Sequence, residues 1–352
     1  MILTLSILIV GNIDCKKNEG NLLTTDSLPH EKKWLVTTVA GNGLAYFADG
    51  PNLTAEFRAP LDVAVDEDGA IYVTDAINHR IRKIFQGRVS TFAGIGIQDT
   101  TSGNSTIAGF AFPSYLVFDK VGNLYTLDIE DPRVRKISSS GFVSVVAGSG
   151  VAGFTDGRAD TAKFGKECLG LAIDEPGNIY VLDWKNRRLR KISTDGNVTT
   201  IAGNDSAGSV NGNPNTAQFL DPAGLAIDKQ GNLFVGDRNV IRKVTPAGFV
   251  STFVGKDSIG YRDGSDKEAL FSSIQDMVID DQGNIYATDE DRIRKITPQG
   301  IVSTIAGSTP GYKDGDGVSA KFNNPVGLGV DGQGNIYVAD DHNNRIRKIS
   351  YQ

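Results

Sequence analysis

The 352-residue chain has few of the residues that most often carry chemistry: two cysteines, three histidines and two tryptophans. Two cysteines exclude a disulfide scaffold. The chain also lacks an excess of positive charge, because 36 basic residues stand against 42 acidic ones. This balance argues against nucleic acid as a partner, which needs a positive field. Long apolar runs are missing as well, and this excludes a polytopic membrane protein.

Glycine, in contrast, is abundant, with 41 residues in the chain. These glycines do not fall at every third position, so collagen is excluded, and a hydrophobic content of 39% excludes wholesale disorder. So much glycine in a globular chain indicates many tight turns. Many tight turns predict many short strands.

The chain opens with an apolar run, Ile2–Ile13, that is closely followed by Cys15. The run has the length of the hydrophobic part of a secretory signal, and the cysteine resembles the lipidation site of a bacterial lipoprotein. Two features depart from that pattern: no Lys or Arg precedes the run, and Asp14 stands where a small residue is expected. An N-terminal strand or buried helix is the alternative. We expect residues 1–15 to be a leader and residues 16–33 a polar tether, so that the protein is exported and touches the membrane only through a lipid on Cys15, as a periplasmic or cell-surface lipoprotein.

The rest of the chain consists of six repeats. A Val-Ser-Thr type of segment recurs at intervals of 53, 54, 55, 52 and 52 residues, beginning at Val36, Val89, Val143, Val198, Val250 and Val302. Each interval holds four short stretches rich in Val, Ile, Leu and aromatic residues, and no window shows a sustained helical period. Residues 34–352 are therefore predicted to form an all-β, six-bladed β-propeller of four-stranded blades. Because the chain begins with the last strand of a blade, this N-terminal strand should complete the final blade and close the ring.

The sequence of the repeats is distinctive. The last repeat reads Pro325–Asp331, Gly334–Asp340 and Asn344–Ile349, and similar segments recur in every unit. These segments resemble the NHL-repeat family, whose members are six-bladed propellers. The family is functionally heterogeneous, so the resemblance implies the fold and says little about function.

Residues that recur in every blade are expected to serve the scaffold. One aspartate should accept backbone N–H groups in the turn after the innermost strand: Asp66, Asp119, Asp174, Asp228, Asp280 and Asp331. A second aspartate should pair with the Arg-x-Arg-Lys strand, which we expect to be half-solvated: Asp75, Asp128, Asp183, Asp237, Asp289 and Asp340. A phenylalanine in each long loop should fill the gap between blades: Phe57, Phe110, Phe164, Phe219, Phe271 and Phe322. Four loop aromatics should pack locally, with sugar stacking as the alternative: Phe47, Phe154, Tyr261 and Tyr312.

Residues that break the repeat are the candidates for function. All long loops belong to one face, and function is expected there. At the start of the innermost strand, Asp62, Tyr115 and Asp276 replace a glycine, and we expect their side chains to reach the mouth of the axial channel. The turns after the second strand are expected to be solvated: His79, Asp131, Trp184, Lys185, Arg187, Arg238, Glu290, Asp291 and His342. Among these, Trp184, Lys185, Arg187 and Arg238 form a basic and aromatic patch.

The functional prediction follows from this set. With His30 in the tether, only His79 and His342 remain, so a histidine-bound zinc site is not expected, and no Ser-His-Asp arrangement is visible. Cys168 is interpreted as a buried small residue. We predict a monomeric, non-catalytic binding propeller that presents its long-loop face to an envelope protein or glycan, with no cofactor. The alternative is a metal-assisted lactonase or lyase-type hydrolase at the channel mouth, with Ca²⁺ on Asp62 and Asp276. A spacer without a ligand is the third reading.

Overall fold

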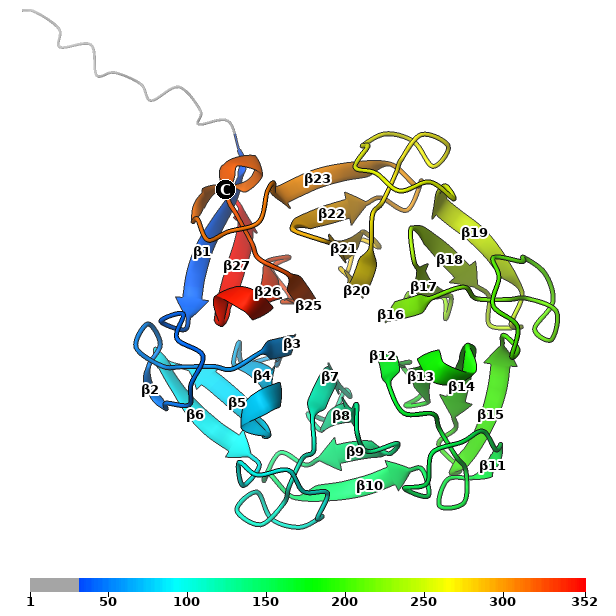
Figure 1. Ribbon diagram of the computed structural model, residues 1–352, viewed down its shortest axis with the longest axis horizontal. Coiled ribbons are helices and arrows are strands. Elements are labelled where there is room, and N and C mark those ends of the chain that lie inside the picture. Colours follow the sequence, from blue (N-terminus) through cyan, green and yellow to red (C-terminus); the bar gives the residue numbers. More distant parts are fainter. Residues whose placement is uncertain (1–31) are drawn as a thin grey trace, which may run out of the picture. The chain divides into compact units, whose positions relative to one another are not determined.

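The computed structural model describes Lys32–Gln352, a ring of six β-sheets around an axis (Figure 1). Each sheet is antiparallel and forms one blade, and successive parts of the chain form successive blades. The predicted six-bladed propeller is confirmed. The leader, Cys15, His30 and the tether up to residue 31 lie outside the described residues. Within residues 32–352, no helix is long and apolar enough to cross a membrane.

Four strands build each blade from the axis outward. The innermost strands are β3 (Pro60–Val65), β7 (Pro113–Phe118), β12 (Cys168–Ile173), β16 (Pro222–Ile227), β20 (Ile274–Ile279) and β25 (Pro325–Val330). The second strands are β4 (Ile71–Asp75), β8 (Leu124–Asp128), β13 (Ile179–Asp183), β17 (Leu233–Asp237), β21 (Ile285–Asp289) and β26 (Ile336–Asp340). The third strands are β5 (Arg80–Phe85), β9 (Val134–Ile137), β14 (Arg188–Ile192), β18 (Val240–Val244), β22 (Arg292–Ile296) and β27 (Arg345–Tyr351). The outer strands are β1 (Trp34–Ala40), β6 (Arg88–Ala93), β10 (Val143–Ala147), β15 (Asn197–Ala202), β19 (Val250–Gly255) and β23 (Val302–Gly307).

Short elements lie in the loops of the long-loop face. Three blades gain a two-residue fifth strand at the rim, namely β2 (Gly50–Pro51), β11 (Gly157–Arg158) and β24 (Gly315–Asp316). Single 3₁₀ turns occur at η1 (Ala76–Asn78), η2 (Trp184–Asn186), η3 (Gly317–Ser319) and η4 (Asp341–Asn343). Three of these turns, η1, η2 and η4, connect the second strand of a blade to its third.

The ring closes where the two ends of the propeller meet. Strand β1 pairs antiparallel with β27, from Trp34 opposite Tyr351 to Ala40 opposite Ile346, and β1 lies beside β27 in Figure 1. Val36 and Ala40 of β1 are completely buried. The N-terminal strand therefore completes the last blade, as predicted, and covers an edge that would otherwise be exposed.

The gaps between blades are filled by the six recurring phenylalanines, all of which are buried. Phe57, for example, packs in one cluster with Val73 of its own blade and with Tyr337 and Ile346 of the preceding blade. The predicted role as a filler between blades is confirmed. Sequential blades thus share apolar cores, and the ring behaves as one domain.

The recurring arginine of the third strand is fully buried, which corrects the prediction of a half-solvated strand. Arg82 illustrates the arrangement: its guanidinium bonds Asp75 at 2.5 Å and the loop residue Asp49 at 2.6 Å. The same pairing to the second-strand aspartate occurs at Arg190, Arg242, Arg294 and Arg347. A buried charge is tolerated only with partners, and these carboxylates supply them. The basic strands are therefore interior supports that also hold the long loops in place.

Blade 2 departs from this pattern. Its buried Arg135 has Asp131 as its ion-pair partner, at 3.6 Å, and Asp131 also pairs with Arg133 at 2.6 Å. Asp131 is only 3% exposed, so the expectation that it is a solvated turn residue was wrong. Asp128 instead accepts the backbone N–H groups of Ala111 and Phe112.

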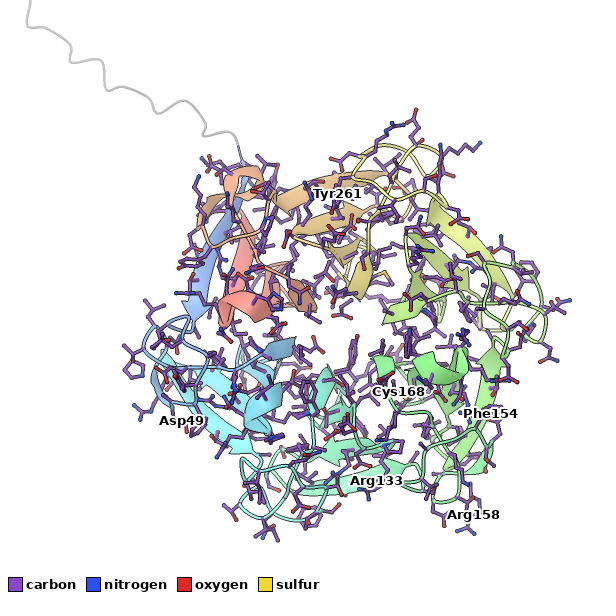
Figure 2. The ribbon with its side chains drawn as sticks, in the orientation of Figure 1. Asp49, Arg133, Phe154, Arg158, Cys168 and Tyr261 are labelled. Carbon is purple, nitrogen blue, oxygen red and sulfur yellow. The ribbon has the colours of Figure 1, made fainter. Side chains whose placement is uncertain are left out.

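The loop aromatics and turn aspartates also serve the scaffold. Phe154 and Tyr261, labelled in Figure 2, lie beneath arginines, with the guanidinium carbons of Arg188 and Arg292 at 3.9 and 3.8 Å from the ring centres. Phe47 and Tyr312 stack in the same way. The turn aspartates accept backbone N–H groups, as at Asp331, which bonds Asn335 at 2.9 Å. The predicted local packing of the aromatics and the predicted bonding of the turn aspartates to backbone N–H groups are both confirmed.

Candidate functional site

Two hollows lie on the propeller axis. The axial cavity, about 210 Å³, is lined by the C-terminal parts of the innermost strands. Asp62, Tyr115 and Asp276 are among its lining residues. The mouth pocket, about 390 Å³, lies where these strands begin, on the long-loop face, and includes Ser114, Tyr115, Trp184, Arg238, Gln275 and Asn324. Tyr115 lines both hollows. It therefore forms the boundary between them.

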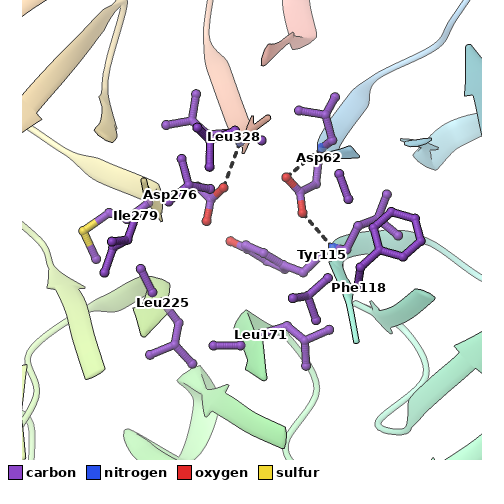
Figure 3. Close-up of a pocket in the computed structure, with 18 of the residues that line it drawn as sticks. Asp62, Tyr115, Phe118, Leu171, Leu225, Asp276, Ile279 and Leu328 are labelled. Carbon is purple, nitrogen blue, oxygen red and sulfur yellow. Dashed lines mark hydrogen bonds between the residues drawn. The ribbon is translucent and has the colours of Figure 1, made fainter. Parts of the chain in front are cut away.

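The three residues that replace the strand glycine are gathered in the axial cavity (Figure 3). Tyr115 reaches across the channel from β7 toward Asp276 on β20. Asp62 and Asp276 are 4% and 5% exposed and line the axial cavity rather than the mouth pocket. The expectation that both carboxylates reach the mouth was wrong, because each is drawn onto the backbone of a neighbouring blade.

Backbone N–H groups hold both carboxylates. Asp62 accepts from Val63 and, in the next blade, from Leu116, both at 2.7 Å. Asp276 likewise accepts from Leu328 of the next blade at 2.9 Å. Each aspartate thus joins two innermost strands through its side chain.

The second strand supports each aspartate with a threonine. Thr74 accepts the N–H of Asp62 at 2.8 Å and donates to the backbone carbonyl of Ser114, and Thr288 accepts the N–H of Asp276 at 2.9 Å. In the three glycine blades the equivalent second-strand residues are Leu182, Gly236 and Ala339, which have no hydroxyl. The glycines themselves allow close packing: a Cβ at Gly224 would lie 2.8 Å from the Asp276 Cα. In the blades of Asp62 and Asp276, an aspartate therefore replaces the glycine, bonds a threonine of the second strand through its N–H, and joins the next blade through its carboxylate.

Burial dominates the electrostatics of the axial cavity. It raises the pKa of Asp62 well above the usual range, and the nearby charge of Asp276 raises it further. Burial also raises the pKa of Asp276 to about 7, although the N–H groups of Leu328 and Met277 oppose the shift. The pKa of the Tyr115 hydroxyl is raised by burial and by both carboxylates. The cavity consequently favours a proton on this pair of carboxyl groups at neutral pH.

The axial cavity does not fit a divalent cation. Within Lys32–Gln352, no group of three or more His, Cys, Asp and Glu side chains is placed to hold a metal ion. Asp62 and Asp276 already accept backbone N–H groups, and their raised pKa values show an environment that disfavours their charged forms. Ca²⁺ prefers six to eight oxygen ligands, several of them charged.

The mouth pocket combines an aromatic residue with polar groups. On one side, Trp184 of η2 donates its indole N–H to Asp221 at 2.7 Å. Beside it, Arg238 occupies the tight turn between β17 and β18 with a φ of 62°. Its N–H bonds the carbonyl of Asp221, and its carbonyl accepts from Ile274 of the next blade. The backbone of Arg238 is therefore fixed, while its exposed side chain remains at the pocket.

The opposite side of the mouth pocket is a chain of amides. Gln275 donates to Asn324 at 3.3 Å, and Asn324 donates to Asp341 at 3.1 Å. Sequence reasoning missed Ser114, Gln275, Asn324 and Asp221. The signal for Ser114 and Gln275 was present, since both are polar at a strand position that is Leu, Leu, Ala or Val in the other blades.

The other predicted site residues lie around the mouth pocket. Lys185 places its ammonium over the Trp184 ring, 5.4 Å from its centre, whereas Arg187 contacts the carbonyl of Asp205, away from the pocket. Of the predicted basic and aromatic patch, Trp184 and Arg238 therefore line the pocket, and Lys185 and Arg187 do not. Cys168, labelled in Figure 2, is buried, and burial raises its thiol pKa.

Comparison with known proteins identifies the repeats. A sequence model described as NHL repeat matches residues 57–84 and 322–349, which belong to the first and last blades. Mouse teneurin-3 (Mus musculus) is 28% identical across 90% of this chain. The chain spans only 13% of the length of that protein.

Solved structures share the fold. A structural genomics protein of unknown function from Bacteroides thetaiotaomicron is 24% identical, with a TM-score of 0.71 over 92% of this chain and 77% of that one. An auxiliary nutrient binding protein from the same species is 20% identical, with a TM-score of 0.68 over 91% and 77% of the two chains. These likenesses show that the chain shares the β-propeller fold of those structures, and two of its six blades carry segments that match the NHL repeat.

Proposed function

We propose that this protein is a non-catalytic binding propeller, tethered at the cell envelope, that presents its long-loop face to a protein or glycan. The observation that carries the proposal is the mouth pocket. It gathers Trp184, Arg238 and the Gln275–Asn324 pair from four different blades at one opening. Its volume of about 390 Å³ lies within the range typical of small-ligand sites.

Two further points support this proposal. Residues repeated in all blades are occupied by the scaffold, whereas the mouth pocket brings together Tyr115, Trp184 and Arg238, which depart from the repeat. The Bacteroides thetaiotaomicron neighbour named as an auxiliary nutrient binding protein uses the same fold. The N-terminal segment with Cys15 supports export and lipid anchoring, with the propeller itself monomeric and free of cofactor.

Capture of ligands on a glycan array and from envelope protein extracts tests the proposal. Wild type should retain a ligand, and the double variant Trp184→Ala/Arg238→Ala should lose at least tenfold in affinity, since a polar anchor and an aromatic wall are each worth about 1 kcal/mol or more. Equal capture by both proteins would move the binding site elsewhere. If wild type captured nothing in either assay, the spacer reading would replace this one.

A metal-assisted lactonase or lyase-type hydrolase is the second candidate, and the observation in its favour is that the side chains of Asp62, Asp276 and Tyr115 share the axial cavity. Turnover of a lactone and ester panel with added Ca²⁺ tests it, using wild type and Asp62→Ala/Asp276→Ala. Metal-dependent turnover that is lost in the variant would overturn the binding proposal. We expect no turnover in either protein.

A further inference from the structure

The mouth pocket contains polar groups that the protein itself leaves unpaired. Ser114 lines this pocket and is 2% exposed, and its hydroxyl oxygen has no hydrogen-bond partner among the described residues. Buried polar atoms without a partner also occur in the scaffold, at the Nε atoms of Arg82 and Arg242. Because the Ser114 oxygen is buried, the pocket offers a ligand the amide groups of Gln275 and Asn324 instead.

Arg238 adds an unpaired cation to the same pocket. Its guanidinium forms no ion pair or hydrogen bond with any residue of the described part of the chain, whereas the buried arginines of the third strands have carboxylate partners. Its backbone is nevertheless anchored on both sides by Asp221 and Ile274. An arginine held in this way is a planar fork suited to a carboxylate.

Two acidic side chains, Asp221 and Asp341, also line this pocket, and neither forms an ion pair with the Arg238 guanidinium within residues 32–352. Asp221 accepts the indole N–H of Trp184, and Asp341 accepts the side-chain N–H of Asn324. Burial raises the pKa of Asp341, although the neighbouring His342 opposes the shift. Arg238 therefore lies near Trp184 and Asp221, and its guanidinium is free to bond a ligand.

These features describe one ligand chemistry. Trp184 offers an apolar ring face to a row of C–H groups, the Gln275 and Asn324 side chains match hydroxyl groups, and Arg238 matches a carboxylate. A peptide C-terminus would also satisfy Arg238, so a peptide is one of the probes in the test below. We propose, on the basis of the binding function above, that the mouth pocket binds the terminal residue of an acidic glycan, a uronic-acid type of sugar whose carboxylate lies against Arg238.

The test is calorimetric titration of three probes into the full chain: a short oligosaccharide that ends in glucuronic acid, its glucose-terminated counterpart and a peptide with a free C-terminal carboxylate. Arg238→Gln removes the cation and keeps a polar side chain. Arg187→Gln is the matched control, because Arg187 occupies the equivalent turn of the neighbouring blade with a φ of 50° but contacts Asp205 outside the pocket.

Wild type and Arg187→Gln should prefer the acidic sugar, and Arg238→Gln should lose roughly 10- to 100-fold for it, the worth of one charge-assisted contact, while binding the neutral sugar as wild type does. Equal binding of both sugars by wild type, or no effect of Arg238→Gln, would overturn the acidic ligand and leave the binding function standing. Binding of the peptide alone would do the same in favour of a protein ligand. Failure of all three probes would count against this ligand class, and the array and extract experiment above would then decide the binding function separately.

Discussion

Arginine and aromatic residues have different roles in the interior of the blades and at the mouth of the channel. In the interior, Arg294 is fully buried and bonds Asp289 and Asp263, and an equivalent arginine–aspartate pair recurs in four other blades. At the mouth, Arg238 occurs once, is exposed and has no partner within residues 32–352. Aromatic residues divide in the same way between Tyr312, stacked on Arg345, and Trp184, which lines the pocket. Repetition marks what the fold needs, and departure from it marks where a ligand can be bound.

The largest expected effect comes from opening the ring. Deletion of residues 1–41 removes β1, whose Val36 and Ala40 are fully buried, and exposes the edge of β27. We expect a loss of roughly 5 kcal/mol or more and a tendency to aggregate. A chain that starts at Lys32 is the control, since it keeps β1. Equal melting temperatures for the two chains would contradict the closure.

The next effect sharpens the difference between regular and irregular blades. Arg294→Met leaves the buried Asp289 without its ion-pair partner and should cost about 3–5 kcal/mol in urea unfolding. Arg135→Met should cost less, because its partner Asp131 still pairs with Arg133. A larger loss for Arg135→Met would show that the ion pairs do not set the stability of the blades.

A smaller effect concerns pH. Asp276 has a pKa of about 7 when folded, against 3.8 ordinarily, so the folded protein keeps a proton that the unfolded chain releases. The stabilisation that protonated Asp276 contributes to the folded state is therefore complete below about pH 4, and it is lost as the pH rises toward about 7. Asp276→Asn keeps an acceptor oxygen for Leu328 and should be more stable than wild type above pH 7, by on the order of 1–4 kcal/mol.

Asp119, a repeated turn aspartate, gives the opposite sign and serves as the control. Burial acts to raise its pKa, but hydrogen bonds from Asn123, Val121 and Tyr125 prevail and lower it. Its contribution is therefore present at neutral pH and is lost as the pH falls through its folded pKa. Unfolding of Asp276→Asn and Asp119→Asn across pH 3–8 should give changes of opposite sign, and a common sign would contradict the account.

The fold could be predicted from the sequence because its signals are local and repeated six times. The position of Phe57 in every long loop and the phase of Val36 indicate blade packing and ring closure without any knowledge of coordinates. Burial of Arg82 could not be predicted in this way, because a lone Arg-x-Arg-Lys strand reads as half-solvated until its two carboxylate partners are placed around it.

The site was predictable only in part. Trp184 and Arg238 stand out as departures from the repeat, and the pocket brings both together. Arg187 departs equally in sequence yet points elsewhere, because side-chain direction depends on the neighbouring loop at Asp205. Asp62 and Asp276 were placed too near the surface, since their bonds to Leu116 and Leu328 of the next blades cannot be read from a single repeat.

The division between repeated and unique residues is tested most directly by one pair of aromatic variants on the same face. Glycan capture and melting temperature should be measured for Trp184→Ala and Tyr312→Ala. We expect Trp184→Ala to lose capture with little change in melting temperature, and Tyr312→Ala to keep capture while its lost contact with Arg345 lowers stability by about 1 kcal/mol. The reverse result, with capture lost in Tyr312→Ala and retained in Trp184→Ala, would contradict the account.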